Sequence, residues 1–372
     1  MLTKFEVENF RNFAGRYVLD FSSPKNYGFN EEAVSSEDKC ITKAIIYGKN
    51  GSGKSNLGLA IFDIVSHLTD FQVKPGRYVP YLNLNVKKSA AEFTYTFIFN
   101  GHTLEYHYAK ESLRTLLSEK MIIDDKTVID YDYRSDAGYS TLEGSETLDL
   151  SLHDNSRSIS RVKYLLNTSV LRDNDENRTF LQFGRFVNGM LLFYSLETRG
   201  YEGFTTGIDD VYASIVDSGK LGDFEAFLRE NGLDYHLRAD NGSSGHTIVC
   251  TFPNGEVPFS SIVSTGTSSL ALFYYWYVQM EKASLVFIDE FDAFYHFELA
   301  ESLVRRIREL RDTQVILTTH NTDLMSNDLL RPDCYFLLGE KRITSLANAT
   351  EKELRQAHNL QKMYKAGAFS ES

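Results

Sequence analysis

The chain has 372 residues, of which 42% are hydrophobic and 24% charged, a mixture typical of a soluble globular protein with two or three domains. Its net charge of −12 at pH 7 argues against a generally basic surface that binds nucleic acid wherever it meets it. The start of the chain lacks the apolar core of a signal peptide, and no stretch reaches the roughly 18 apolar residues of a membrane helix. We therefore expect a cytoplasmic protein with no membrane partner.

The thiol and imidazole groups indicate neither a disulfide framework nor a zinc site. Cys40, Cys250 and Cys334 lie far apart in the sequence and form no CxxC pair. The nine histidines lack the spacing of metal ligands. Reduced thiols are therefore expected.

Alternating apolar residues predict strands near the start of the chain, at 2–10 and 17–21, with a turn at 11–15 between them. Residues 92–110 predict a hairpin around the Asn-Gly pair at 100–101, the strongest short turn signal. A two-residue turn there gives the hairpin one apolar and aromatic face, through the cross-strand pairs Phe97 with Leu104, Tyr95 with Tyr106 and Phe93 with Tyr108.

The middle of the chain shows little sustained periodicity. Residues 118–178 are polar and rich in Asp, with short strand candidates at 121–123 and 127–129, and they predict an inserted lobe with long loops. The elements expected after this stretch are an apolar helix at 180–196, a helix at 221–230 ended by Asn231-Gly232, and a hairpin at 235–252 that turns at 241–245.

Patterns of a parallel sheet return in the last third. A short apolar strand at 285–288 precedes an amphipathic helix and a second strand at 315–317. These strands need the apolar strand at 43–47 as a neighbour, so both outer thirds are expected to form one α/β domain. The expected divisions are 1–117 and 236–345 for the two parts of this domain, 118–235 for the inserted lobe and 346–372 for a helical tail.

A complete phosphate-binding motif follows the strand at 43–47. Residues 48–55 have the sequence GKNGSGKS, and apolar residues then recur at helical spacing, as the strand, loop and helix setting of this motif requires. Glycines let the backbone wrap a phosphate, and the positive end of the helix attracts the anion. We expect a nucleoside triphosphate, with Lys54 at its β- and γ-phosphates and Ser55 as a Mg²⁺ ligand. The other expected contacts come from Gly48, Asn50, Gly51, Ser52 and Gly53.

Two carboxylates end the strand at 285–288. Asp289 is placed to hold Mg²⁺ through its water, and Glu290 to polarise the attacking water, since ligands bind at the carboxyl edge of such a sheet. Taken alone, an apolar strand ending in Asp-Glu is as often a strand that meets a solvated turn. The phosphate-binding motif favours the functional interpretation.

Two further segments offer groups for a γ-phosphate. His320 follows the strand at 315–317 and can donate a hydrogen bond at the same edge, although a lone histidine there is usually structural. Ser264 and Gly266 precede an apolar helix at 270–280, where they are either a simple N-cap or a second anion-binding site. The residues leave both interpretations open.

Together these elements resemble the ABC-type ATPase head shared by RecF, SMC and the overcoming-lysogenization-defect proteins. Residues 48–56 are similar to the family form GxNGSGKSN, in which Asn56 also belongs to the nucleotide site, and residues 8–13 are similar to the start of these heads. Ser264 and Gly266 match the serine and first glycine of the family's signature motif, although the residues after them depart from it. The resemblance covers both outer thirds of the chain.

The acidic segment sharpens the resemblance. Glu290 matches the catalytic glutamate and His320 the switch histidine, while 289–296 is similar to the DExxxxLH stretch of RecF-like and phage-exclusion ATPases. This form disfavours a transporter. The implied fold is α/β, an ABC-type P-loop ATPase head with a mixed central sheet, an antiparallel β-subdomain and an inserted α/β lobe.

The resemblance implies ATP and Mg²⁺ as cofactors and a homodimer or higher homo-oligomer, in which Ser264 of one copy contacts the ATP held by Lys54 of the other. Residues 331–367 look like the end of compact bacterial AAA-family ATPases from anti-phage operons. A separate effector protein, a nuclease or toxin, is then the expected partner, and nucleic acid stays open. The alternatives are a RecF-like or SMC-like DNA-repair ATPase and an ATP-gated scaffold with little turnover.

The chain also departs from the family pattern. Its Q-loop glutamine has no clear position, with Gln72 and Gln182 as candidates, and the middle contains no long heptad segment of the kind that forms an SMC-like tether. Near the end, Thr350 and Glu353 predict a capping box and hence a helix. Basic residues around that helix fit a solvated face better than a binding surface.

Overall fold

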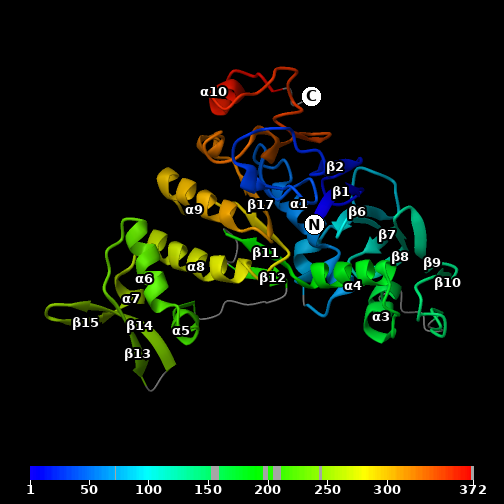
Figure 1. Ribbon diagram of the computed structural model, residues 1–372, viewed down its shortest axis with the longest axis horizontal. Helices are drawn as coiled ribbons and strands as arrows, with labels where there is room; N and C mark the ends of the chain where they lie inside the picture. The colour runs from blue at the N-terminus through cyan, green and yellow to red at the C-terminus, as the bar shows by residue number, and fades with distance from the viewer. Residues whose placement is uncertain (72, 152–158, 196–199, 204–210, 243–244, 370–372) are drawn as a thin grey trace.

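Two seven-stranded sheets organise the residues that the structure describes (Figure 1). This computed structural model describes residues 1–71, 73–151, 159–195, 200–203, 211–242 and 245–369. The central sheet has the order β12-β11-β16-β17-β5-β18-β19. Its strands are β5 (Lys43–Tyr47), β11 (Met190–Tyr194), β12 (Gly200–Gly203), β16 (Leu285–Asp289), β17 (Gln314–Thr319), β18 (Tyr335–Leu338) and β19 (Ile343–Ser345).

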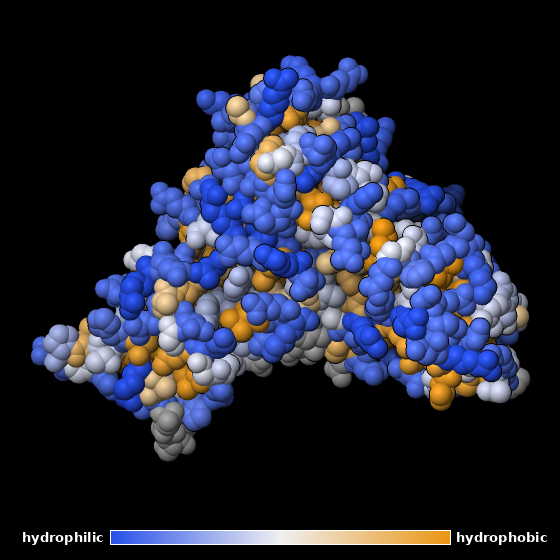
Figure 2. Space-filling view, viewed as in Figure 1, coloured by the Kyte–Doolittle hydropathy of each residue, from blue (hydrophilic) through white to orange (hydrophobic). Residues whose placement is uncertain are grey.

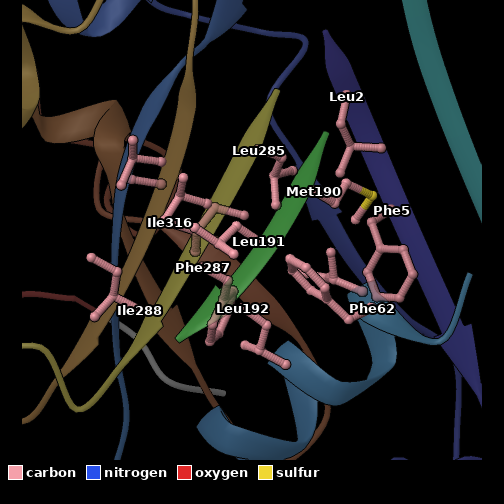
Figure 3. Packing of buried hydrophobic residues seen from close by; sticks show 14 of the residues in the cluster. Leu2, Phe5, Phe62, Met190, Leu191, Leu192, Leu285, Phe287, Ile288 and Ile316 are labelled. Atoms are coloured by element: carbon pink, nitrogen blue, oxygen red, sulfur yellow. The ribbon is translucent and has the colours of Figure 1, made fainter. Parts of the chain in front are cut away.

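The central sheet is mixed, as predicted. The five inner strands run parallel to their neighbours, and β12 and β19 are antiparallel at the two edges. Every residue of β5, β11, β16 and β17 is buried, which explains their nearly continuous apolar sequences. Figure 3 shows β11 residues such as Leu191 packed beside Phe287 of β16. The α/β fold class is confirmed.

Helix α1 (Lys54–Phe62) packs closely on the central sheet. Gly58 lies in the middle of this helix, and a Cβ atom there would lie 2.7 Å from the ring of Phe287 on β16. The missing side chain therefore lets the helix approach the strand. This packing fixes α1 relative to β16.

The second sheet is antiparallel, with the order β10-β9-β8-β7-β6-β1-β2. The predicted hairpin is confirmed, including the pairs of Phe97 with Leu104, Tyr95 with Tyr106 and Phe93 with Tyr108. Its aromatic face is buried beneath α2 and α4. The elements of this part are β1 (Leu2–Glu8), β2 (Tyr17–Asp20), β6 (Ala91–Phe99), β7 (His102–Ser112), β8 (Thr115–Ile123), β9 (Lys126–Asp132), β10 (Ala137–Ser140), α2 (Val65–Leu68), α3 (Arg161–Thr168) and α4 (Asp175–Asn188).

The long loops predicted from residue 118 are wrong for the first part of that stretch. Strand β8 crosses this position, and β9 and β10 continue the same antiparallel sheet. The pairing shifts register at Met121/Ile122 of β8 and leaves Val128 of β9 without a partner, so Val128 and Ile129 are both buried and the alternation of β9 is interrupted. That bulge explains why the sequence showed little periodicity.

The single helix predicted at 180–196 is also wrong. Helix α4 ends at Asn188, Gly189 caps it, and Met190–Tyr194 form β11 of the central sheet. A fully buried strand and a buried helix are both apolar on all sides, so periodicity alone does not separate them. The prediction therefore joined two elements at Gly189.

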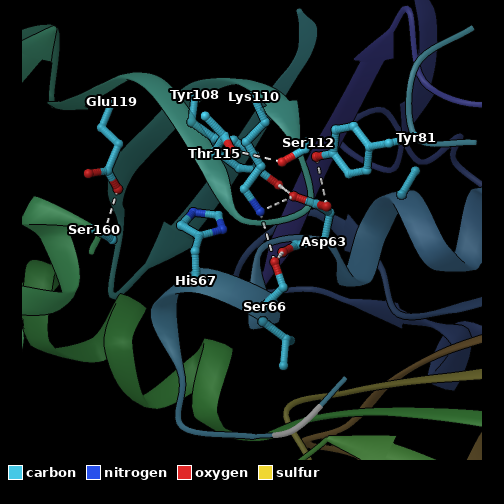
Figure 4. Close-up of polar contacts among 12 residues, drawn as sticks. Asp63, Ser66, His67, Tyr81, Tyr108, Lys110, Ser112, Thr115, Glu119 and Ser160 are labelled. Carbon is cyan, nitrogen blue, oxygen red and sulfur yellow. Dashed lines mark hydrogen bonds and ion pairs between the residues drawn. The ribbon is translucent and has the colours of Figure 1, made fainter. Parts of the chain in front are cut away.

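A polar cluster joins α1 to the antiparallel sheet (Figure 4). Asp63, the residue after α1, accepts hydrogen bonds from Lys110 Nζ at 2.7 Å, Tyr81 at 2.9 Å and Tyr108 at 3.0 Å. The side chains of Asp63 and Lys110 are both fully buried. Burial lowers the pKa of Lys110, while the attraction of Asp63 opposes that change. A buried charge of either sign needs such a partner.

The remaining elements form a flank beside the central sheet, on the side opposite the antiparallel sheet in Figure 1. Helix α6 has the predicted bounds, and the predicted hairpin is present, although residues 243–244 of its turn lie outside the described residues. Hydrophilic residues cover most of the face shown in Figure 2. The flank contains α5 (Val211–Asp217), α6 (Leu221–Glu230), β13 (Leu237–Gly242), β14 (Gly245–Phe252), β15 (Gly255–Pro258), α7 (Phe259–Ile262) and α8 (Thr265–Met280), and α9 (Phe297–Glu309) follows.

The capping box predicted in the C-terminal segment is wrong. The Thr350 hydroxyl accepts a hydrogen bond from Lys352 N at 3.3 Å, a local turn that competes with a helix start, and α10 (Leu360–Lys365) begins later, capped by Asn359. Within the described residues, no helix combines the length and apolar character needed to cross a bilayer. The short elements are β3 (Val34–Ser35), β4 (Cys40–Ile41) and the 3-10 turns η1 (Glu31–Ala33), η2 (Pro75–Tyr78), η3 (Thr322–Leu324) and η4 (Pro332–Cys334).

Candidate functional site

The phosphate-binding loop connects β5 to α1. Gly51 and Gly53 have φ of 79° and 104°, in the region that favours glycine, and Gly53 is the residue from which α1 starts. A Cβ atom on Gly53 would lie 2.2 Å from the amide nitrogen of Asn12. Lys54 is buried, and its Nζ donates to the carbonyls of Gly48 at 3.0 Å and Lys49 at 3.4 Å. The loop is thus a concave turn, and the ammonium group of Lys54 lies against its backbone carbonyls.

The acidic pair lies at the same sheet edge as this loop. Asp289 ends β16, Glu290 follows, and only β17 separates β16 from β5. A cavity of about 410 Å³ is lined by Ser55, Asp289 and Glu290, and one of about 360 Å³ by Lys54, Ser55 and Glu290. The structure therefore brings together the residues expected to bind phosphate and those expected to activate water. Asn50, Gly51, Gly53 and Asn56 line the smaller cavity as well.

Two threonines of β17 hold the turn at 289–292, which lies at the end of β16 and is called the acidic turn below. The Thr318 hydroxyl donates to Asp289 at 2.7 Å and accepts from the Glu290 backbone N–H at 2.9 Å. The Thr319 hydroxyl donates to Asp292 at 2.5 Å. Neither role was predicted from the sequence, because the contacts join β17 to residues far away in the chain and no local pattern marks them.

Glu290 and His320 form an ion pair, with 2.7 Å between Glu290 Oε2 and His320 Nε2. The side chain of Glu290 is 17% exposed and that of His320 49%. Burial raises the pKa of Glu290, with a smaller rise from Asp289, while the positive charge of His320 opposes the change. The pair therefore places a carboxylate of raised basicity beside the phosphate-binding loop.

The turn at 11–15 is hydrogen-bonded to the phosphate-binding loop and to the start of α1. Arg11 Nε donates to Asn56 Oδ1 at 2.7 Å, Asn56 Nδ2 donates to Asn12 Oδ1 at 2.6 Å, and Asn12 Nδ2 donates to the Ser52 carbonyl at 3.1 Å. This turn and its family likeness were predicted from the sequence, but these contacts were not. The adjacent Arg11 and Asn12 were the available signal.

Arg77 and Tyr194 also line the larger cavity, and neither was predicted. The Arg77 guanidinium lies 3.7 Å from the centre of the Tyr194 ring. Arg11 Nη1 donates to the Arg77 carbonyl at 2.6 Å. These cationic groups make the cavity suited to an anion, and no motif in the sequence indicated them.

Ser264 and Gly266 lie apart from this site. Ser264 is the N-cap of α8 and accepts from Thr267 N at 3.2 Å, as a simple capping residue does. Neither residue lines the described cavities around the phosphate-binding loop. Of the two glutamine candidates, Gln72 lies outside the described residues, and Gln182 belongs to α4, which packs on the antiparallel sheet.

The donor set fits a magnesium nucleotide. Ser55 and Asp289 contribute a hydroxyl and a carboxylate to one cavity, and oxygen ligands of this kind suit Mg²⁺. On the other side of the loop, a cavity of about 720 Å³ lies between Asn12, Lys49 and the turn at 338–341. This space is large enough for the nucleoside that accompanies the phosphates.

Several solved structures are distantly similar to the chain. An SMC head domain from Thermotoga maritima is 14% identical, with a TM-score of 0.40, over 90% of this chain and 94% of that one. An Smc head domain bound to the C-terminal domain of ScpA, from Pyrococcus furiosus, is 12% identical, with a TM-score of 0.41, over 92% and 95%. An SmcHead bound to the C-winged helix domain of ScpA is 15% identical, with a TM-score of 0.46, over 92% and 97%.

A comparison with curated protein sequences finds no significant match. A family comparison does: residues 43–326 match the family described as "AAA domain, putative AbiEii toxin, Type IV TA system". The match runs from the first residue of β5 to beyond β17, so it includes the phosphate-binding loop, the acidic pair and His320. It covers well over half of the chain, which therefore belongs to this family of AAA domains.

Proposed function

We propose that this protein binds ATP with Mg²⁺ and hydrolyses the ATP to ADP and phosphate. The observation that carries the proposal is the Glu290–His320 ion pair, because Glu290 lines the same cavities as Lys54 and Ser55. A half-buried carboxylate with a raised pKa next to a phosphate-binding loop is suited to activate water.

Each residue has a defined part in the reaction. Lys54 and the loop N–H groups bind the β- and γ-phosphates, and Glu290 orients a water molecule and accepts its proton. The water oxygen bonds to the γ-phosphorus, the bond from that phosphorus to the β,γ-bridging oxygen breaks, and ADP leaves. Ser55 and Asp289 would hold Mg²⁺, which neutralises part of the phosphate charge when bound.

We further propose that two copies associate head to tail on ATP. Ser264 and Gly266 lie outside the cavities of their own phosphate-binding loop, so a contact from them to ATP would come from a second copy. Free N–H groups at the start of α8 suit a γ-phosphate. ATP would then hold the two copies together and hydrolysis would release them.

The dimer's role is proposed as sensing and control in bacterial anti-phage defence. The family description names a toxin of a toxin–antitoxin system, which supports this setting. Because residues 43–326 are assigned to the ATPase site in this proposal, the effector that the ATP cycle regulates is proposed to be a separate nuclease or toxin chain.

The first test compares wild type, Glu290→Gln and Glu290→Gln with Lys54→Ala, by light scattering with and without ATP and by phosphate release. We expect wild type to hydrolyse ATP, Glu290→Gln to stay dimeric on ATP, and the second change to abolish that dimer. A chain that releases no phosphate and stays monomeric with ATP would overturn the proposal. Pull-down of a co-encoded chain by the ATP-locked dimer would support the effector.

A further inference from the structure

The segment after His320 is held by the C-terminal segment of the chain. Asn327 is buried, and its Nδ2 donates to three backbone carbonyls there, those of Arg355 at 3.0 Å, Gln356 at 3.2 Å and His358 at 3.0 Å. The side-chain amide of Asn327 thus binds the backbone of residues 355–358. The two segments are therefore fixed to each other close to His320.

A second contact comes from α10 itself. Gln361 Nε2 donates to the carboxylate of Asp323 and lies 3.5 Å from the Thr322 hydroxyl. Asp323 belongs to η3, which begins two residues after His320. Leu354 and Leu360 of the C-terminal segment are buried, so the segment is packed against the rest of the molecule as well as hydrogen-bonded.

These contacts continue to the acidic turn. Asp323 N donates to Asn321 Oδ1 at 3.0 Å, and Asn321 N donates to the Thr319 hydroxyl at 2.9 Å. That hydroxyl in turn donates to Asp292, two residues after Glu290. A series of hydrogen bonds, linked through Asp323, Asn321 and Thr319, therefore connects Gln361 to Asp292 and passes the residues on either side of His320 in the sequence.

Tyr47 is the last residue before the phosphate-binding loop, and its hydroxyl is buried. Burial raises its pKa well above the usual value, and smaller electrostatic contributions from Tyr335, Asp292 and Asp323 act in the same direction. The carboxylate that accepts from Gln361 therefore acts electrostatically on a residue that adjoins the phosphate-binding loop.

We propose that the C-terminal segment at 355–365 is a positioning element of the hydrolytic site, and that Gln361 acts through Asp323 to hold His320 against Glu290. The inference rests on the proposed function, because it assigns a role in hydrolysis at Glu290. No residue of the segment lines the described cavities around the phosphate-binding loop. The segment sets the position of the group that pairs with the water-activating carboxylate.

The test is Gln361→Ala, with Lys362→Ala as a matched control on an exposed position of the same helix. We expect kcat for ATP to fall on the order of tenfold in Gln361→Ala with KM unchanged, because small displacements of catalytic groups are costly and the phosphate-binding loop is untouched. Lys362→Ala should keep the wild-type kcat.

Two substitutions of Asp323 distinguish a positioning role from a purely structural one. Asp323→Asn keeps an oxygen that accepts from Gln361 and should retain most of the activity, whereas Asp323→Ala should repeat the loss of Gln361→Ala. An equal kcat in wild type and Gln361→Ala, with or without a lower melting temperature, would overturn this inference alone. Absence of hydrolysis in the wild type would instead overturn the proposed function, and this inference with it.

Discussion

Glu290 adopts a backbone conformation that is uncommon for a residue with a side chain. Its φ is 52°, in the left-handed region, and such residues tend to occur at functional sites where surrounding contacts hold them. Here the holding contacts are the Thr318 hydroxyl, which accepts from Glu290 N, and the Thr318 carbonyl, which accepts from Phe291 N at 2.9 Å. These contacts fix the backbone from which the carboxylate reaches His320.

The electrostatics of this residue predict a pH dependence. Burial raises the pKa of Glu290 above its usual value of 4.5. The hydrolysis rate should therefore begin to decline, as pH falls, at a pH above the range in which ordinary carboxyl groups titrate. His320 opposes that rise, so His320→Ala should move the acidic limb to higher pH in addition to lowering the rate. Hydrolysis rates measured at saturating ATP over a range of pH would show this shift. An acidic limb at the same pH in wild type and His320→Ala would contradict the proposed effect of His320 on the pKa of Glu290.

The sequence located the groups proposed to act in hydrolysis better than the groups that hold them. Lys54, Glu290 and His320 were predictable because each sits in a local pattern, at the end of a strand or the start of a helix. Thr318 and Arg77 were not, since they act on residues far away in the chain through contacts that only the tertiary structure creates.

The fit of α1 against β16 predicts the effect of one methyl group. Gly58→Ala would place a Cβ atom 2.7 Å from the buried ring of Phe287, closer than real Cβ contacts come. We expect a loss of roughly 1–3 kcal/mol in the free energy of unfolding from overpacking, although alanine favours a helix by about 1 kcal/mol relative to glycine. Urea unfolding would measure it.

Gly76→Ala is the matched control for this change. A Cβ atom at Gly76 meets nothing within 4 Å, so the free energy of unfolding should stay the same or rise slightly. Equal stability of Gly58→Ala and Gly76→Ala would show that α1 can move away from β16 at little cost.

Among whole elements, those with a regular pattern or a clear end were predictable. The hairpin at β6 and β7 and the helix α6 agree with the sequence because an Asn-Gly turn and an Asn-Gly helix end mark them. Strand β11 was missed because its apolar residues follow an apolar helix directly, and β9 was only partly recognised because a bulge interrupts its alternation. Pairing with β16, which is distant in the chain, decided the case of β11.

The stability of the whole molecule should depend on pH through Lys43. This lysine is buried at the start of β5, its Nζ donates to the Thr313 carbonyl at 2.8 Å, and burial lowers its pKa to about 8 from 10.5. The unfolded chain therefore binds this proton more tightly, so the cost to stability is complete below the folded pKa and is relieved as pH rises from about 8 towards 10.5.

Lys43→Met removes this dependence. Between about pH 7 and about pH 10, the unfolding free energy of the wild type should rise relative to that of the variant by on the order of 2 kcal/mol. Denaturant unfolding at several pH values measures the difference. Parallel curves for the two proteins would rule out a shifted Lys43.

The buried pair of Asp63 and Lys110 has a mechanical consequence. Helix α1 starts at the residues proposed to bind phosphate and ends beside Asp63, which Lys110 fixes to β7. Separating these two charges inside the protein would leave each without a partner, at a cost of several kcal/mol. Helix α1 is therefore fixed to the antiparallel sheet at the end away from the phosphate-binding loop. A displacement of its first residues is transmitted along the helix to that sheet.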